Sequence, residues 1–227
     1  MTTVAENLAA IRQQIRDLES KYERAPGSVK LLAVSKRHSS AVIREAAAAG
    51  ARDFGENYLQ EAQDKMAELQ ELNLCWHFIG PIQSNKTRGI AEAFDWAHSV
   101  DRLKIARRLS EQRPAQAGPL NICLQVNLSA EDSKSGVELA AVPALAADIA
   151  PLPGLALRAL MAIPAPARTL AEQRRIFAPL AACFRELQDQ YPRFDTLSMG
   201  MSNDFEAAIA EGSTLLRLGT ALFGPRD

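Results

Sequence analysis

The sequence predicts an α/β fold, specifically a (β/α)8 TIM barrel that forms a single domain. Short apolar segments without helical period alternate with amphipathic segments, giving eight strand–helix units. Regular alternation of this kind indicates a parallel sheet covered by helices, and the count of eight favours closure into a barrel. The 227 residues match the usual length of such a barrel. Because no linker or low-complexity tract interrupts the pattern, we expect residues 1–227 to form one domain.

The first half of the chain begins with an amphipathic helix over residues 3–24, whose apolar positions recur at helical spacing. Short apolar runs bounded by turn residues then predict buried strands. The expected strands are 29–36, 51–57, 74–80 and 94–100. Helices should follow each of them, the first capped by Ser39 or Ser40 and stopped by Gly50, and the last opened by Asp101. Their expected ranges are 41–49, 58–72, 84–92 and 101–112.

The second half repeats the same alternation. The expected strands are 121–127, 155–163, 196–200 and 215–219, each a short apolar run. The expected helices are 137–150, 169–190 and 204–211, and a short turn closes the chain.

Composition excludes several classes of protein. The formal charge is −1 and the sequence pI about 6.3, so nothing favours nucleic acid or an anionic membrane. No apolar run approaches the roughly 20 residues of a membrane helix, and the N-terminus lacks the apolar core of an export signal. Cys75, Cys123 and Cys183 have no metal-binding spacing, which indicates free thiols. We expect a cytoplasmic protein without a metal site, and the absence of a large apolar helix face favours a monomer.

Polar side chains gather at the carboxyl ends of the expected strands, where barrels carry their chemistry. The first strand ends on Lys36. Burial disfavours the charged form of a lysine, and a neutral amine can attack a carbonyl. A lysine that caps the strand and reaches solvent is the alternative. The other strand ends contribute Glu56, Asn57, His77, Ser99, Asp101, Asn127 and Met161.

Small and hydroxyl-bearing residues follow the last two strands: Ser198, Gly200, Ser202 and Asn203 after one, Gly219 and Thr220 after the other. Barrels commonly bind phosphate between these loops, where backbone N–H groups are accessible. Ordinary turn chemistry is the alternative. Together with Lys36, the pattern predicts a ligand that carries both a carbonyl and a phosphate, either pyridoxal 5'-phosphate or a sugar phosphate aldehyde.

Arg217 helps to separate these two ligands, because it lies inside the last strand, two residues before Gly219. An arginine beside a pyridine nitrogen would keep that nitrogen unprotonated, which suits binding or restrained chemistry. The alternative is a buried arginine paired with Glu56 or Asp101.

Other polar and sulfur-containing residues are more simply explained as structural. His77 is a lone histidine in an apolar strand and is predicted to be a satisfied core residue. Lys134 lies in a polar loop, as a solvated charge or as a lid residue that contacts an anion. The methionines near the strand ends, Met161, Met199 and Met201, are predicted to line the pocket.

Six segments resemble the pyridoxal phosphate homeostasis protein family: LLAVSK, FGENYLQE, WHFIGPIQSNK, HSVD, VNLSAEDSKSG and LSMGMSNDFEAAIAEGSTLLRLGTALFG. The resemblance runs from about residue 29 to 224 and implies a fold-type III barrel, similar to the N-terminal domain of alanine racemase. It implies a Schiff base between pyridoxal phosphate and Lys36. It further places in the cofactor site Asn57, Met201, Ser202, Arg217, Gly219 and Thr220. Lys134 matches a second lysine associated with cofactor handling. His38, where the family often has a lysine, and Pro81 depart from the family pattern.

The function implied by the resemblance is buffering or delivery of pyridoxal phosphate, with apoenzymes that depend on this cofactor as further partners. A racemase of this fold uses a second base from a separate domain, and the sequence stops at Asp227, directly after the barrel. Since one lysine cannot transfer protons on two faces of a ring, we expect a carrier rather than an enzyme. The alternatives are a pyridoxal phosphate-dependent racemase or lyase, and a Schiff-base aldolase.

Overall fold

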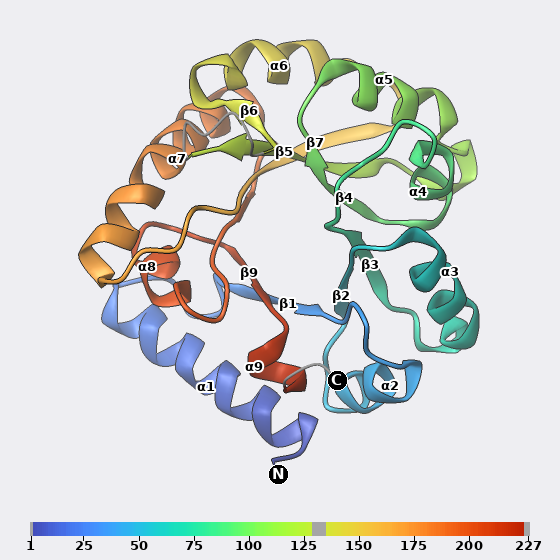
Figure 1. The fold of residues 1–227 in the computed structure, drawn as a ribbon. Coiled ribbons are helices and arrows are strands. Elements are labelled where there is room, and N and C mark those ends of the chain that lie inside the picture. Colours follow the sequence, from blue (N-terminus) through green and yellow to red (C-terminus); the bar gives the residue numbers. More distant parts are fainter. Residues whose placement is uncertain (1, 129–134, 225–227) are drawn as a thin grey trace.

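Eight parallel strands close into a barrel in the computed structural model, which describes residues 2–128 and 135–224 (Figure 1). Around the barrel the order is β1-β2-β3-β4-β5-β7-β8-β9, and β9 pairs back with β1. The strands are β1 (Lys30–Val34), β2 (Asp53–Glu56), β3 (Cys75–Phe78), β4 (Trp96–Val100), β5 (Leu120–Asn127), β7 (Leu155–Ala162), β8 (Thr196–Ser198) and β9 (Leu215–Leu218). Each overlaps a predicted strand, and the predicted barrel is confirmed.

Helices form a ring outside the strands (Figure 1). They are α1 (Val4–Lys21), α2 (Ser40–Ala48), α3 (Leu59–Glu68), α4 (Thr87–Ala93), α5 (Leu103–Gln112), α6 (Val142–Ile149), α7 (Leu170–Gln190), α8 (Phe205–Ala210) and α9 (Thr220–Phe223). Short 3-10 turns are η1 (Gln70–Leu72), η2 (Ala115–Ala117) and η3 (Leu139–Ala141). Among the described residues, no helix has both the length and the apolar character needed to cross a bilayer.

The first helix completes the outer layer at the point where the chain closes. α9 has four residues, too few to cover the junction of β1 and β9. α1 packs against α2, α8 and α9 and lies along this side of the barrel (Figure 1). Thr3 begins it through a capping box with Glu6, in which each side chain binds the other residue's backbone N–H. The N-terminal segment therefore serves as part of the barrel wall.

The predicted helix over 137–150 begins too early. Residues Val137–Glu138 instead form a short strand, β6, that pairs in parallel with Val126 and Asn127 at the end of β5. The helix α6 begins at Val142, with Pro143 in its first turn. Proline suits that turn because its missing N–H would have no helical partner there.

A buried ion pair joins α3 to β2 next to the end of β1. The Lys65 ammonium contacts carboxylate oxygens of Glu56 at 2.8 Å and Glu61 at 2.6 Å, and it donates to the carbonyl of Ser35 at 2.9 Å. The Ser35 hydroxyl donates to Glu56 at 2.7 Å. Burial raises the pKa of Glu56, although the hydrogen bonds from Lys65 and Ser35 act in the opposite direction. These bonds fix the backbone of the residue that immediately precedes Lys36.

We expect Lys65→Met to destabilise the protein by about 3–5 kcal/mol, because it leaves the Glu56 carboxyl buried without its cation. Urea unfolding measures the loss. Lys104→Met, at an exposed position of α5, is the matched control and should change the free energy of unfolding by less than about 0.5 kcal/mol. Equal changes in the free energy of unfolding for the two substitutions would show that the buried ion pair does not stabilise the protein.

Candidate functional site

A pocket of about 180 Å³ opens at the carboxyl ends of the strands. Apolar walls come from Val34, Ile79 and Ile163. The rest of the lining is the set of residues predicted to bind a cofactor: Lys36, Asn57, Met201, Ser202, Arg217, Gly219 and Thr220. The fold thus brings all of them to one cavity, since each lies in or just after a strand at the same end of the barrel.

Lys36 reaches the pocket from a turn rather than from the strand itself. β1 ends at Val34, and the N–H of Ser35 still donates to Gly55 of the neighbouring strand at 3.0 Å. Arg37 has a left-handed backbone with φ of 63°, and the N–H of His38 donates to Ser35 at 3.0 Å. The chain therefore turns away sharply after Lys36, whose side chain is half-buried in the pocket wall.

Arg217 is a buried cation held by three hydrogen bonds. Its guanidinium donates to the carbonyl and the hydroxyl of Ser198, both at 2.7 Å, and to the carbonyl of Ala162 at 2.8 Å. Burial lowers the pKa of Arg217 to about 10, so the group remains a cation at neutral pH. Among the bonds of the described residues, none joins Arg217 to a carboxylate, and the alternative pairing with Glu56 or Asp101 is not found.

A chain of hydrogen bonds leads from Arg217 through the barrel interior. Ser198 Oγ lies 3.3 Å from His98 Nδ1, His98 Nε2 lies 2.9 Å from His77 Nδ1, and His77 Nε2 lies 3.1 Å from Asp53 Oδ1. His98 is on β4 and Ser198 on β8, which are not neighbours, so this bond spans the interior. The prediction that His77 is a buried, hydrogen-bonded residue is confirmed, whereas its connection to the pocket was not anticipated.

The protonation states of the side chains determine the direction in which these hydrogen bonds are donated. An ionised Asp53 accepts only, so His77 carries its proton on Nε2. Burial lowers the pKa values of both His77 and His98, which are therefore neutral at neutral pH. His98 must then donate from Nε2 to His77 and accept at Nδ1 from the Ser198 hydroxyl. Every donor points from Arg217 towards Asp53.

The loop after β8 places Met201 and Ser202 by a close backbone approach. Gly200 has φ of 100°, and its carbonyl accepts from the N–H of Arg217 at 3.0 Å. A Cβ added at Gly200 would lie 2.7 Å from the Cβ of Ala208. The N–H of Met201 donates to Asp204 Oδ1 at 2.6 Å. Glycine is required here both for the left-handed backbone and for the contact with α8.

Several residues singled out in the sequence lie elsewhere. Glu56 faces α3, and His77 and Asp101 do not line the pocket. The prediction for the methionines is correct for Met201 and wrong for Met161 and Met199, which are buried in the core. Lys134 lies outside the described residues. The wall residues Ile79 and Ile163 were missed, although an apolar residue directly after a strand is a usable signal.

Gly200→Ala should destabilise the protein by about 1–3 kcal/mol, because the new methyl group overlaps α8. Gly212→Ala is the matched control: its φ is 102°, almost the same as at Gly200, but nothing lies within 4 Å of its added Cβ. Thermal unfolding of the two variants separates steric overlap from backbone strain. A larger loss at Gly212 would refute the role given to the contact with α8.

Comparison with known proteins gives concordant matches along the chain. A family model for the alanine racemase N-terminal domain matches residues 7–227. The pyridoxal phosphate homeostasis proteins of Pseudomonas aeruginosa and Escherichia coli are 60% and 52% identical, and the matches cover 100% of this chain and 97% and 98% of theirs.

Solved structures agree with these matches. PipY of Synechococcus elongatus, determined with pyridoxal phosphate bound, superposes with a TM-score of 0.85 at 43% identity, covering 98% of this chain and 100% of that one. An alanine racemase from Corynebacterium glutamicum shares the fold, with a TM-score of 0.67 at 19% identity over 95% of this chain and 60% of its own. The chain belongs to the pyridoxal phosphate homeostasis protein family.

Proposed function

We propose that this protein binds pyridoxal 5'-phosphate at the carboxyl ends of its strands and serves in the homeostasis of that cofactor by buffering or delivering it. The observation that carries the proposal is the meeting of Lys36 and Arg217 in one pocket rimmed by Ser202 and Thr220. Family membership supports it, since the full-length relatives are pyridoxal phosphate homeostasis proteins and PipY was determined with the cofactor bound.

The residues present fit this cofactor. Pyridoxal phosphate supplies an aldehyde that condenses reversibly with a primary amine. Lys36 is the amine of the pocket, and Ser202 and Thr220 offer hydroxyl donors to a phosphate beside the small residue Gly219. The buried side-chain oxygen of Asn57 has no hydrogen-bond partner among the described residues, so a bound ligand would provide one.

Arg217 tunes the site towards binding. Its position is fixed by bonds to Ser198 and Ala162, which use three of the five N–H groups of a guanidinium. If the pyridine nitrogen of the cofactor faced this guanidinium, Arg217 would donate to that nitrogen and disfavour its protonation. An unprotonated ring would withdraw electrons weakly and so restrain carbanion chemistry.

The side chains of the pocket walls bear on whether the site could racemise a substrate. In the described part of the chain, the pocket lining contains no carboxylate, histidine, tyrosine or cysteine. Racemisation needs proton transfer on both faces of the substrate, and a group opposite the lysine would have to supply the second transfer. This composition favours a carrier that passes the cofactor to apoenzymes over a racemase.

The first test is the visible absorbance of the purified protein before and after borohydride reduction, with mass mapping of the labelled peptide. We expect a yellow protein whose reduced cofactor maps to Lys36, and Lys36→Ala should lose at least 90% of the label. Lys104→Ala, on the exposed face of α5, should keep it. A colourless protein that pyridoxal phosphate cannot reconstitute would overturn the proposal and favour a sugar phosphate as ligand.

The second test separates a carrier from an enzyme. Incubation of the cofactor-loaded protein with L-amino acids should give their D-enantiomers no faster than free pyridoxal phosphate does, because the lining that the described residues provide has no second proton-transfer group for the opposite face. Chiral chromatography measures the conversion, with an alanine racemase as positive control. Conversion at a rate comparable to that enzyme would establish the racemase alternative.

A further inference from the structure

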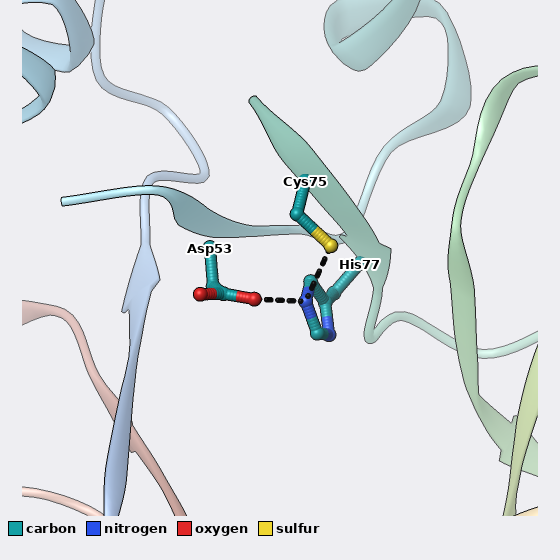
Figure 2. Close-up of side chains that lie close together, drawn as sticks. All are labelled: Asp53, Cys75 and His77. Carbon is teal, nitrogen blue, oxygen red and sulfur yellow. Dashed lines mark hydrogen bonds and ion pairs between the residues drawn. The ribbon is translucent and has the colours of Figure 1, made fainter. Parts of the chain in front are cut away.

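The opposite mouth of the barrel, at the amino ends of the strands, holds a second cavity of about 420 Å³. Asp53 and His77 line it, and the thiol of Cys75 lies beside them (Figure 2). Sulfur, imidazole nitrogen and carboxylate oxygen are the ligand atoms of zinc sites in proteins. The family resemblance and the proposed cofactor pocket assign no role to this cluster.

Strand register brings the three side chains together. Asp53 and Cys75 are direct partners in the parallel pairing of β2 and β3. Cys75 and His77 are two residues apart on one strand and so project from the same face. Figure 2 shows the carboxylate and the thiol converging on one imidazole nitrogen. The ligand atoms of the three residues all lie within 4.8 Å of one another.

The distances suit a tetrahedral ion with little movement. Zinc binds sulfur at about 2.3 Å and nitrogen or oxygen at about 2.0–2.1 Å, so tetrahedral angles require about 3.5 Å between sulfur and nitrogen and about 3.3 Å between nitrogen and oxygen. The corresponding separations here are 3.4 Å for Cys75 Sγ to His77 Nε2 and 3.1 Å for His77 Nε2 to Asp53 Oδ1. Two of the three separations are therefore close to the required ones, and the third, between Cys75 Sγ and the Asp53 carboxylate, is at most 4.8 Å.

The imidazole is held in position by its surroundings. His77 Nδ1 is bonded to His98 Nε2 at 2.9 Å, and its ring stacks on Trp96 with an interplanar angle of 6°. Metal-bound histidines in proteins are usually oriented in this way by a partner at the other nitrogen. The carboxylates of Asp53 and Asp95 both lie near the Cys75 thiol, and their negative charge favours a cation at this position.

The described residues that line this cavity include two cations, Lys30 and Arg158. Arg158 is engaged by the carboxylate of Asp195, at 2.5 Å and 3.2 Å. Lys30 is exposed on a flexible stem, and its ammonium can turn to solvent.

We propose that Asp53, Cys75 and His77 form a binding site for a zinc-class divalent cation, with a water molecule from the 420 Å³ cavity as fourth ligand. On binding, the Cys75 thiol releases its proton to solvent and coordinates as thiolate. His77 stays neutral and moves its proton from Nε2 to Nδ1. The charges of the thiolate and the Asp53 carboxylate balance the two charges of the ion.

The change of tautomer at His77 reverses the direction of the hydrogen bonds through the barrel interior. With its proton on Nδ1, His77 becomes the donor to His98, which in turn donates from Nδ1 to Ser198. Ser198 can accept this bond together with the one from Arg217, because a hydroxyl oxygen has two lone pairs. The bound ion thereby keeps the bonds between His77, His98 and Ser198 with their direction reversed. It replaces the bond from His77 to Asp53 by two coordination bonds, and it requires the Ser198 hydroxyl to donate to another acceptor.

The test is a cobalt titration of the full-length protein, reduced and freed of metal by a chelator. We expect one Co²⁺ to bind per chain and Zn²⁺ to displace it. The bound Co²⁺ should give a thiolate-to-cobalt charge-transfer band. It should also give d–d bands with the intensity of a tetrahedral site, at wavelengths beyond any cofactor absorption. Cys75→Ser should abolish the charge-transfer band and weaken Zn²⁺ binding at least tenfold. Cys183→Ser, on α7, is the matched control and should preserve both. Lys36→Ala should also bind normally, which separates this site from the cofactor pocket.

Asp53→Asn gives a second, independent variant at a partly exposed position. It removes one anionic ligand and should weaken Zn²⁺ binding at least tenfold while keeping the charge-transfer band, with thermal unfolding without metal confirming that each variant is folded. Absence of stoichiometric binding, or binding unchanged in Cys75→Ser, would overturn the proposal and leave the three residues as an ordinary hydrogen-bonded cluster.

Discussion

The structure depends on one buried charge, the guanidinium of Arg217, whose hydrogen bonds connect the pocket to the barrel interior. A buried charge without a counter-ion is costly unless its donors are satisfied, and Arg217 meets this requirement with the oxygens of Ser198 and Ala162. The positive charge then acts on the polar groups around it. It lies at the pocket side of the interior, and its charge adds to the burial that keeps His98 neutral. A single residue of β9 thus places a positive charge at the pocket and donates to Ser198 at one end of the interior hydrogen bonds, while Asp53 accepts at the other end.

The interior connects two mouths of different chemistry. At the carboxyl ends lie an amine, hydroxyls and small residues; at the amino ends lie a carboxylate, a thiol and an imidazole. Ser198, His98 and His77 link the two, and each can donate in only one direction at a time. A ligand that changes the donor at one end therefore changes the hydrogen bonds offered at the other, and any such coupling between the two ends must be reciprocal.

The sequence was sufficient for features that depend on strand order alone. Apolar runs such as LLAV located the strands, and because parallel strands all end at one mouth, Lys36, Asn57 and Arg217 could be assigned to a common pocket. Features that depend on register or on the angular position of a helix were not accessible. Lys65 meets Glu56 only through the orientation of α3, and His98 meets Ser198 only across a closed barrel. The strand at Val137 forms because β5 extends far enough to pair with it.

The pocket lining supports the proposal that the site holds a cofactor over the proposal that it racemises a substrate. Racemisation needs proton transfer on both faces of the substrate, and among the described residues the lining contains no carboxylate, histidine, tyrosine or cysteine for a second transfer. Reversible attachment of an aldehyde to the Lys36 amine needs no such group. Lys36 is only half-buried and lies in a turn at the rim, so water and an incoming amine can approach it. Attachment that is stable yet open to exchange is what buffering and delivery require.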